Sequence, residues 1–139
     1  MKTINVLILF VIMPLSACVS LSPQELRDKT NPLDFTVNQT YQDVFAKVLK
    51  QTKQCYLNSP KALSQITVSG DRNNREKTGA IRVTYLYGPT ESDTVLLVDV
   101  KSLGTDKTQV RAHYSHRWWK SDAQRIRKWV EEGAESCSA

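Results

Sequence analysis

Apolar side chains recur at spacings of three and four residues after Thr40, which is the pattern of one face of a helix. Thr40 supplies a hydroxyl and Asp43 an acidic side chain three residues later, a variant of the capping box that marks a helix start. The polar run Asn58–Pro60 would end this helix near Tyr56. Its predicted apolar positions are Tyr41, Val44, Phe45, Val48, Leu49, Cys55 and Tyr56.

A second stretch, from Ser121 to about Ser136, has the same helical periodicity. Ser121 stands three residues before Gln124, which again matches a capping box. Charged side chains such as Glu132 fall on the opposite face, so both helices are expected to pack their apolar sides on a sheet. The apolar face of this second helix holds Trp119, Ala123, Ile126, Trp129, Val130, Gly133 and Cys137.

Between the two helices, and once before them, apolar and polar residues alternate with the period of two that is typical of strands. The alternation is clearest in residues 80–87. Residues 94–103 form the most apolar run outside the N-terminal segment, which predicts a central strand. The predicted strands are 34–37, 65–69, 80–87, 94–103 and 108–114, with turns at 70–78, 88–90 and 104–107.

This order of elements predicts an α+β fold. We expect a two-layer sandwich made of a short strand, a helix, a four-stranded antiparallel sheet and a helix, with both helices packed on one face of the sheet. In a simple meander with tight connections the two helices would run antiparallel. As a pattern of elements only, this order resembles helix-grip and TATA-binding-protein-like arrangements, and no functional residue is carried over from that resemblance.

The first eighteen residues follow a different pattern. Lys2 gives a positive start, Ile4–Met13 is apolar apart from Asn5, and Pro14 ends the run. Such a run is too short for a permanent membrane span, which needs roughly 20 apolar residues. A positive charge, a short apolar core and small residues before a cleavage site are typical of a secretory signal peptide.

The signal ends in Leu15-Ser16-Ala17-Cys18, which resembles the lipobox of bacterial lipoproteins. The resemblance implies cleavage before Cys18, whose thiol then carries a diacylglyceryl group and whose amine is open to acylation. Two or three acyl chains anchor a protein firmly, whereas one binds only marginally. An ordinary signal peptide with an incidental cysteine is the alternative. In the Gram-negative lipoproteins that this signal resembles, Asp after the cysteine retains the protein in the inner membrane, so Val19 predicts the outer membrane with the domain facing the periplasm.

Cleavage would divide the chain into a signal peptide (residues 1–17), a lipidated tether (residues 18–33) and a single α+β domain (residues 34–139). The tether is predicted to lack fixed structure and to space the domain from the membrane, because Pro, Ser, Asn and charged residues leave it little apolar periodicity. Removing 17 of the 139 residues leaves 122, which is enough for one domain with its own core.

Three cysteines are present, and lipidation of Cys18 would leave Cys55 and Cys137. An even pair in an oxidising compartment predicts one disulfide, while two separate buried thiols are the alternative. Antiparallel helices would hold the two carboxyl ends apart, which opposes the bond. The connection at residues 57–64 could reach about 26 Å when extended and return the chain along the sheet.

The formal net charge is +5, and it falls to +4 without Lys2. This excess would suit anionic lipid or lipopolysaccharide surfaces, with a solvated surface that binds nothing as the alternative. Cations are densest in residues 111–128, beside Trp118 and Trp119, a mixture that can bind sugars, headgroups or nucleic acid. The predicted export of the protein argues against nucleic acid as its ligand. The alternative places Trp119 and Trp129 in the core and the cations on the wet face of the helix.

The sequence predicts no catalytic residue, metal ligand or cofactor. We expect His113 and His116 at the surface and Asp99 facing solvent, although a buried Asp99 with a raised pKa could serve catalysis. Ser115 and His116 are adjacent on a strand and would point in opposite directions. No Cys–His cluster has the spacing of a metal site, and no Gly-rich loop could bind phosphate.

Location rather than chemistry therefore suggests the function. The sequence favours a non-catalytic envelope lipoprotein that acts through a protein partner, as an accessory or assembly factor. The alternative is a binding module for an apolar or anionic envelope ligand in a cleft between sheet and helices. A hydrolase is the third and least supported hypothesis.

Overall fold

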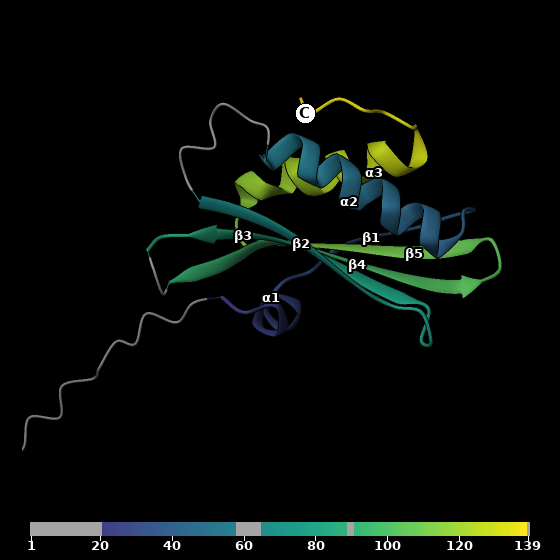
Figure 1. Ribbon diagram of the computed structural model, residues 1–139, viewed down its shortest axis with the longest axis horizontal. Helices are drawn as coiled ribbons and strands as arrows, with labels where there is room; N and C mark the ends of the chain where they lie inside the picture. Colours follow the sequence, from purple (N-terminus) through teal and green to yellow (C-terminus); the bar gives the residue numbers. More distant parts are fainter. Residues whose placement is uncertain (1–20, 58–64, 89–90, 139) are drawn as a thin grey trace, which may run out of the picture.

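The computed structural model describes residues 21–57, 65–88 and 91–138. They form an α+β fold in which three helices pack on a five-stranded antiparallel sheet of order β1-β5-β4-β3-β2 (Figure 1). This confirms the predicted fold class. The elements are α1 (Pro23–Lys29), β1 (Leu33–Val37), α2 (Tyr41–Leu57), β2 (Gln65–Asn73), β3 (Thr78–Leu86), β4 (Ser92–Gly104), β5 (Lys107–Tyr114), a 3₁₀ turn (Arg117–Trp119) and α3 (Lys120–Glu131).

The most apolar strand, β4, lies at the centre of the sheet, as its composition predicts. Its residues Leu96–Val98 are almost fully buried because both faces of the sheet are covered there. The short strand β1 pairs antiparallel with β5, with Phe35 opposite Val110, and so becomes the fifth strand of the same sheet.

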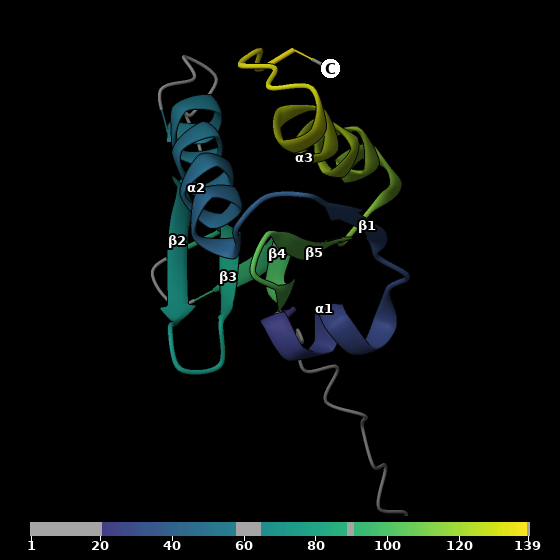
Figure 2. The same cartoon turned by 90° about the vertical axis from the view of Figure 1, so that its right-hand side faces the viewer.

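Helices α2 and α3 lie side by side on one face of the sheet, as predicted (Figure 2). They run antiparallel. At one end the Gln39 side chain donates to the carbonyl of Val130 over 2.9 Å, and at the other the Tyr56 hydroxyl donates to Asp122. Buried side chains from α2, α3 and the inner face of the sheet form one core, in which Trp129 is 1% exposed.

The start of α2 is confirmed, whereas both ends of α3 differ from the prediction. The backbone N–H of Asp43 donates to the Thr40 hydroxyl over 3.2 Å, so Thr40 caps α2. The capping box predicted at Ser121 is wrong, because the chain enters α3 through the preceding 3₁₀ turn and the Ser121 hydroxyl donates to the carbonyl of Trp118 instead. The helix ends at Glu131, ahead of Gly133 with its φ of 68°.

The strand β2 is also longer than predicted, since residues 70–73 continue its pairing with β3. At Gly70, an added Cβ would come within 2.9 Å of Leu49 on α2. Glycine therefore lets the helix approach the strand closely here, and the predicted turn at 70–78 shrinks to residues 74–77.

The expectation of an unstructured tether through residue 33 is wrong from residue 22 onward. Ser22 and Glu25 form a complete capping box, and Pro23 occupies the first helical turn of α1. Leu26 is fully buried against the sheet face opposite α2 and α3, where Leu97 is also fully buried. The folded domain therefore begins near Leu21, and α1 adds a partial third layer that Figure 2 shows below the sheet.

Candidate functional site

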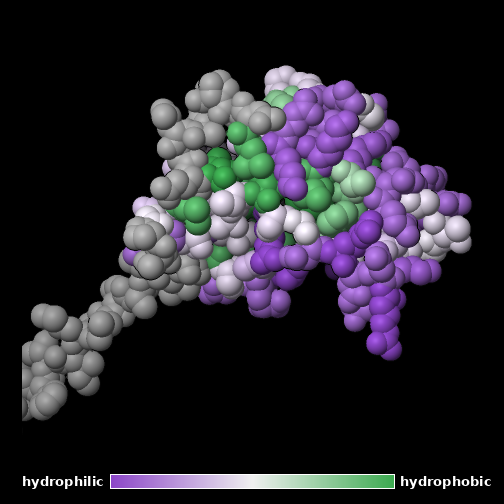
Figure 3. Space-filling model, in the orientation of Figure 1, coloured by the Kyte–Doolittle hydropathy of each residue, from purple (hydrophilic) through white to green (hydrophobic). Residues whose placement is uncertain are grey.

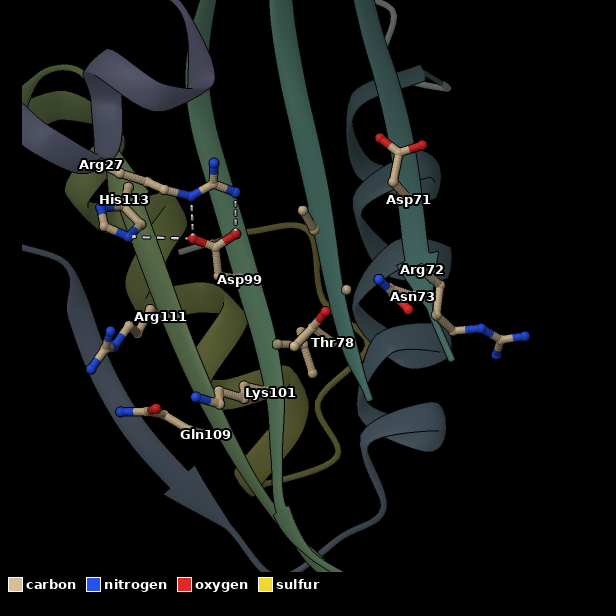
Figure 4. A pocket seen from close by; sticks show the side chains of 13 residues that line it. Arg27, Asp71, Arg72, Asn73, Thr78, Asp99, Lys101, Gln109, Arg111 and His113 are labelled. Carbon is tan, nitrogen blue, oxygen red and sulfur yellow. Dashed lines mark hydrogen bonds and ion pairs between the residues drawn. The ribbon is translucent and has the colours of Figure 1, made fainter. Parts of the chain in front are cut away.

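The face of the sheet opposite α2 and α3 is covered only in part, by α1, and holds a hollow of about 620 Å³ that we call the polar cleft (Figure 4). Strand alternation builds it, because the residues between the core positions of β4 and β5 point to this face. Its labelled polar side chains come from α1 and from strands β2 to β5: Arg27, Asp71, Arg72, Asn73, Thr78, Asp99, Lys101, Gln109, Arg111 and His113.

An ion pair between α1 and the central strand closes one side of the polar cleft. Arg27 donates from Nε to Asp99 Oδ2 over 2.8 Å and from Nη2 to Oδ1 over 2.6 Å, a two-pronged contact. The hydrogen bonds to Asp99 raise the pKa of the Arg27 guanidinium. Asp99 is therefore half-buried beneath α1 rather than facing open solvent as expected, and both of its oxygens are engaged.

The imidazole of His113 lies behind this ion pair and is only 5% exposed, so the expectation of a surface histidine is wrong here. Its Nδ1 is 3.1 Å from the Thr30 hydroxyl, and its Nε2 is 3.6 Å from Asp99 Oδ2. Burial is the main cause that lowers the pKa of His113, which favours the neutral ring. His116, by contrast, is exposed as predicted.

Charges of both signs are fixed around the rest of the polar cleft. Arg111 donates to Asp34 over 2.9 Å, and Arg82 donates to Asp71. Lys101 is exposed and forms no ion pair among the residues that the structure describes. Arg72 lines the rim, but its side chain points away from the hollow in Figure 4.

This arrangement can bind charged groups, and its central carboxylate and imidazole are already engaged by protein groups. Both Asp99 oxygens accept hydrogen bonds from Arg27, and both ring nitrogens of His113 face protein groups. Within the described parts of the chain, no cluster of three or more His, Cys, Asp or Glu side chains could hold a metal ion.

Acidification should destabilise the domain through His113. Its pKa is lowered from the ordinary value of 6.5 in the folded state, so below pH 6.5 the unfolded chain takes up the proton more readily than the folded one. The neutral ring's contribution is fully present above pH 6.5 and is lost as the pH falls below it. Urea denaturation at several pH values should show a slope of at most about 1.4 kcal/mol per pH unit from this proton. His113→Gln should reduce the slope, and His116→Gln should leave it unchanged; equal slopes in all three proteins would contradict the assignment.

A second hollow, of about 830 Å³, lies at the end of the sheet where Leu21 enters the fold. We call it the aromatic hollow, after the rings of Tyr85, Tyr87, Trp118 and Trp119 that line it. Trp118 is 76% exposed and Tyr87 is 59% exposed, whereas Trp119 is partly buried and packs on the core.

The cation-rich region predicted from residues 111–128 is therefore not one surface. Arg111 belongs to the polar cleft, while Arg125 pairs with Asp122 and Arg127 with Glu131 along α3. The alternative interpretation holds for two of the tryptophans, because Trp129 lies in the core and Trp119 packs against it. Trp118 is the exception, because its ring stays outside.

Cys55 and Cys137 lie at disulfide distance, with Cα atoms 5.3 Å apart and sulfur atoms 2.06 Å apart. Cys137 is not on a helix face as expected, because α3 has already ended at Glu131. The C-terminal segment, which is yellow in Figure 1, instead turns back toward the end of α2. It thereby brings the two sulfur atoms together although the helices are antiparallel. Cys18 and its lipobox lie outside the described residues.

Neither a scan against protein-family models nor a search of curated proteins found a match to this chain. Among the described helices, none has the length and apolar content that crossing a membrane requires. What the protein does must therefore be inferred from its own residues.

Proposed function

We propose that this protein is a non-catalytic lipoprotein of the bacterial envelope that acts through a protein partner, as an accessory or assembly factor, and that the polar cleft is its contact surface. The observation that carries the proposal is the set of charges of both signs fixed on an uncovered part of the sheet face. Alternating charges of this kind select a partner by matching its own charges and steer its approach.

The charged groups of the polar cleft are positioned before any partner arrives. Arg27, Arg82 and Arg111 each hold a carboxylate, so a docking surface would meet fixed charges rather than mobile side chains. Lys101 projects among them as an exposed cation. A partner with a protruding acidic segment would complement Lys101 while its basic residues approach Asp34 and Asp71.

A smaller anionic ligand is the second candidate, because one specific observation favours it. The volume of the polar cleft, about 620 Å³, falls within the range of roughly 300–1,000 Å³ that is usual for small-molecule sites. Lys101 and the outer edge of Arg27 could contact a carboxylate or phosphate group. Ala80 and Val100 also line the polar cleft, so an anionic ligand with an apolar part would fit there as well.

The proposed location in the envelope agrees with the cysteine pair. Cys55 and Cys137 would be oxidised after export, because the periplasm favours disulfides and the cytosol does not. The pair closes a loop with a sequence separation of 82 residues, so its formation depends on the fold rather than on local sequence.

Anchoring is tested at Cys18. Cys18→Ser should leave the protein unlipidated and release it into the soluble periplasmic fraction, because acyl chains supply the attachment. Metabolic labelling with a clickable fatty acid, followed by membrane fractionation, measures both effects. Val19→Asp should remain lipidated but move to the inner membrane if the sorting rule applies. Equal labelling of the wild type and Cys18→Ser would refute the lipobox interpretation.

The partner is tested by crosslinking in intact cells. A photoreactive side chain at Gln109, inside the polar cleft, should capture a defined protein, whereas the same group at the exposed Lys50 on α2 should not. Reversing two cleft charges with Lys101→Glu and Arg111→Glu should weaken capture by about tenfold or more.

The control for charge reversal is a matched pair on α3, Lys128→Glu with Arg127→Glu. Each pair combines an exposed lysine with a half-exposed arginine in an ion pair, since Arg111 and Arg127 are 52% and 51% exposed. Equal loss of capture in both double variants would mean that net charge, rather than the polar cleft, causes the effect. A small adduct in native mass spectrometry that disappears only in the cleft variant, without protein capture, would favour the second candidate.

A further inference from the structure

The aromatic hollow lies where the chain leaves the fold toward Cys18. The backbone N–H of Leu21 donates to Asp93 Oδ1 over 2.7 Å, and the carbonyl of Leu21 accepts from the N–H of Thr94 over 2.9 Å. Ser22 then caps α1, so the chain is held in place from Leu21 onward. Leu21 itself lines the aromatic hollow.

Chain length limits how far this end of the domain can stand from a lipid on Cys18. Only Val19 and Ser20 stand between Cys18 and Leu21, and the three residue steps from Cys18 to Leu21 span about 10 Å when fully extended. That distance is smaller than the domain itself and comparable to the headgroup region of one leaflet. A lipid anchor at Cys18 therefore brings the end that carries Leu21 to the membrane surface.

The side chains at this end suit a membrane surface. Of the four large apolar side chains that are exposed in the described residues, Tyr87 and Trp118 line the aromatic hollow, and a third is Leu57 at the end of α2. Leu57 follows Tyr56, whose ring packs 5.9 Å from that of Trp119. Figure 3 shows apolar surface toward the same end of the molecule. Tyr and Trp are the residues that favour the membrane–water boundary, because their rings are apolar and their polar atoms stay hydrated.

Exposed cations surround the rings. Lys29 lies on the rim of the aromatic hollow, and Arg117 and Lys120 flank Trp118 and Trp119 along the chain. Basic side chains close to a membrane are attracted to anionic headgroups. Two acidic groups lie near them: Glu25 pairs with Lys29 over 3.4 Å, and Asp93 is occupied by the N–H of Leu21.

We propose that the aromatic hollow is a membrane-docking surface. Trp118 and Tyr87 lie at headgroup level in the leaflet that holds Cys18, with Lys29, Arg117 and Lys120 against anionic headgroups. This inference rests on the proposed lipid anchor and replaces a domain suspended on a tether with one held in a fixed orientation. The β2–β3 turn and the polar cleft beside it then lie toward the far side, where a partner can reach them.

Quenching by brominated lipids tests this orientation. The full lipidated protein is reconstituted in vesicles of phosphatidylethanolamine and phosphatidylglycerol with brominated acyl chains near the headgroup. Quenching of tryptophan fluorescence is expected, and Trp118→Phe should remove most of it, because Trp129 is buried in the core and Trp119 is partly buried. Trp118 is exposed, so its substitution should not unfold the domain, and circular dichroism verifies this.

The matched control moves the reporter to the opposite end. Leu103 is 49% exposed next to the β4–β5 turn, and Leu103→Trp in the Trp118→Phe background should not restore quenching. Equal quenching of wild type and Trp118→Phe, or quenching at position 103 as strong as at 118, would overturn the docking surface.

The same samples separate the two proposals. Mass spectrometry of the purified protein reports the acyl chains on Cys18, so their absence refutes the anchor itself. Acylated protein without quenching at Trp118 refutes only the docking surface. Capture of a protein by a photoreactive group at Tyr87 in cells, together with absent quenching, would identify this end as a protein interface and equally overturn the proposal.

Discussion

Replacing Trp129 with alanine should lower the free energy of unfolding by about 3–5 kcal/mol, the usual cost of removing a large buried aromatic side chain. Trp129 is 1% exposed in the core beneath α3, and its Nε1 donates to the carbonyl of Ser136 over 2.9 Å. The substitution therefore creates a cavity and also removes one of the two attachments of the C-terminal segment. Urea denaturation, followed by circular dichroism, measures the change.

Trp118→Ala is the matched control for this prediction. The same side chain is removed from a position that is 76% exposed, so the free energy of unfolding should change by no more than about 0.5 kcal/mol. Trp129→Phe should fall between the two, because it keeps much of the apolar packing and loses the hydrogen bond to Ser136. If Trp129→Ala costs no more than Trp118→Ala, the assigned core is wrong.

Removing the Cys55–Cys137 bond should have the second large effect. The loop-entropy relation gives about 4–5 kcal/mol for a separation of 82 residues, an upper figure for the loss of stability. The Cys55→Ser, Cys137→Ser double variant and the reduced wild type should lose similar amounts. Alkylation of the unreduced, denatured mature protein should find no free cysteine; two alkylated thiols would refute the bond.

The two large effects should also be coupled. The C-terminal segment is attached to the core at Ser136, through Trp129, and at Cys137, through Cys55. Losing one attachment already loosens the segment, so the remaining attachment contributes less to the stability of the fold. Combining Trp129→Ala with the cysteine variant should therefore cost less than the sum of the separate changes. Strict additivity would indicate that the segment is anchored elsewhere.

Periodicity predicted the sheet and the two large helices because each of these elements buries a regular apolar face. α2 buries Val44, Phe45 and Val48, and these spacings of one, three and four fit one face of a helix but not a strand's period of two. α3 buries Ile126, Trp129 and Val130 in the same pattern. α1 has no such repeat, since Leu26 is its one buried side chain. The signal that could have found it is the capping box Ser22–Glu25 with Pro23 between.

The polar cleft was not predicted either, because it too has no repeating pattern in the sequence. Asp99 and His113 were considered from the sequence, but their partner Arg27 lies in the segment expected to be unstructured, and pairing across 72 residues leaves no local pattern. The cysteine pair was predicted, but the expected detour through residues 57–64 lies outside the described residues except for Leu57, which ends α2. The turn after α3 brings Cys137 back because Gly133 permits a positive φ.

The weak attachment of α1 has a mechanical consequence. Tension between the proposed lipid on Cys18 and the proposed partner would enter the domain at Leu21, where two hydrogen bonds join it to the start of β4. α1 would yield first under such a load, while the core under α2 and α3 stays intact. One apolar side chain, the Arg27–Asp99 pair and the contact between Thr30 and His113 secure α1, far fewer contacts than hold α2 or α3. Release of residues 21–32 would extend the link by up to about 40 Å. α1 would thus unfold under force and lengthen the link to the membrane, and its refolding would draw the domain back.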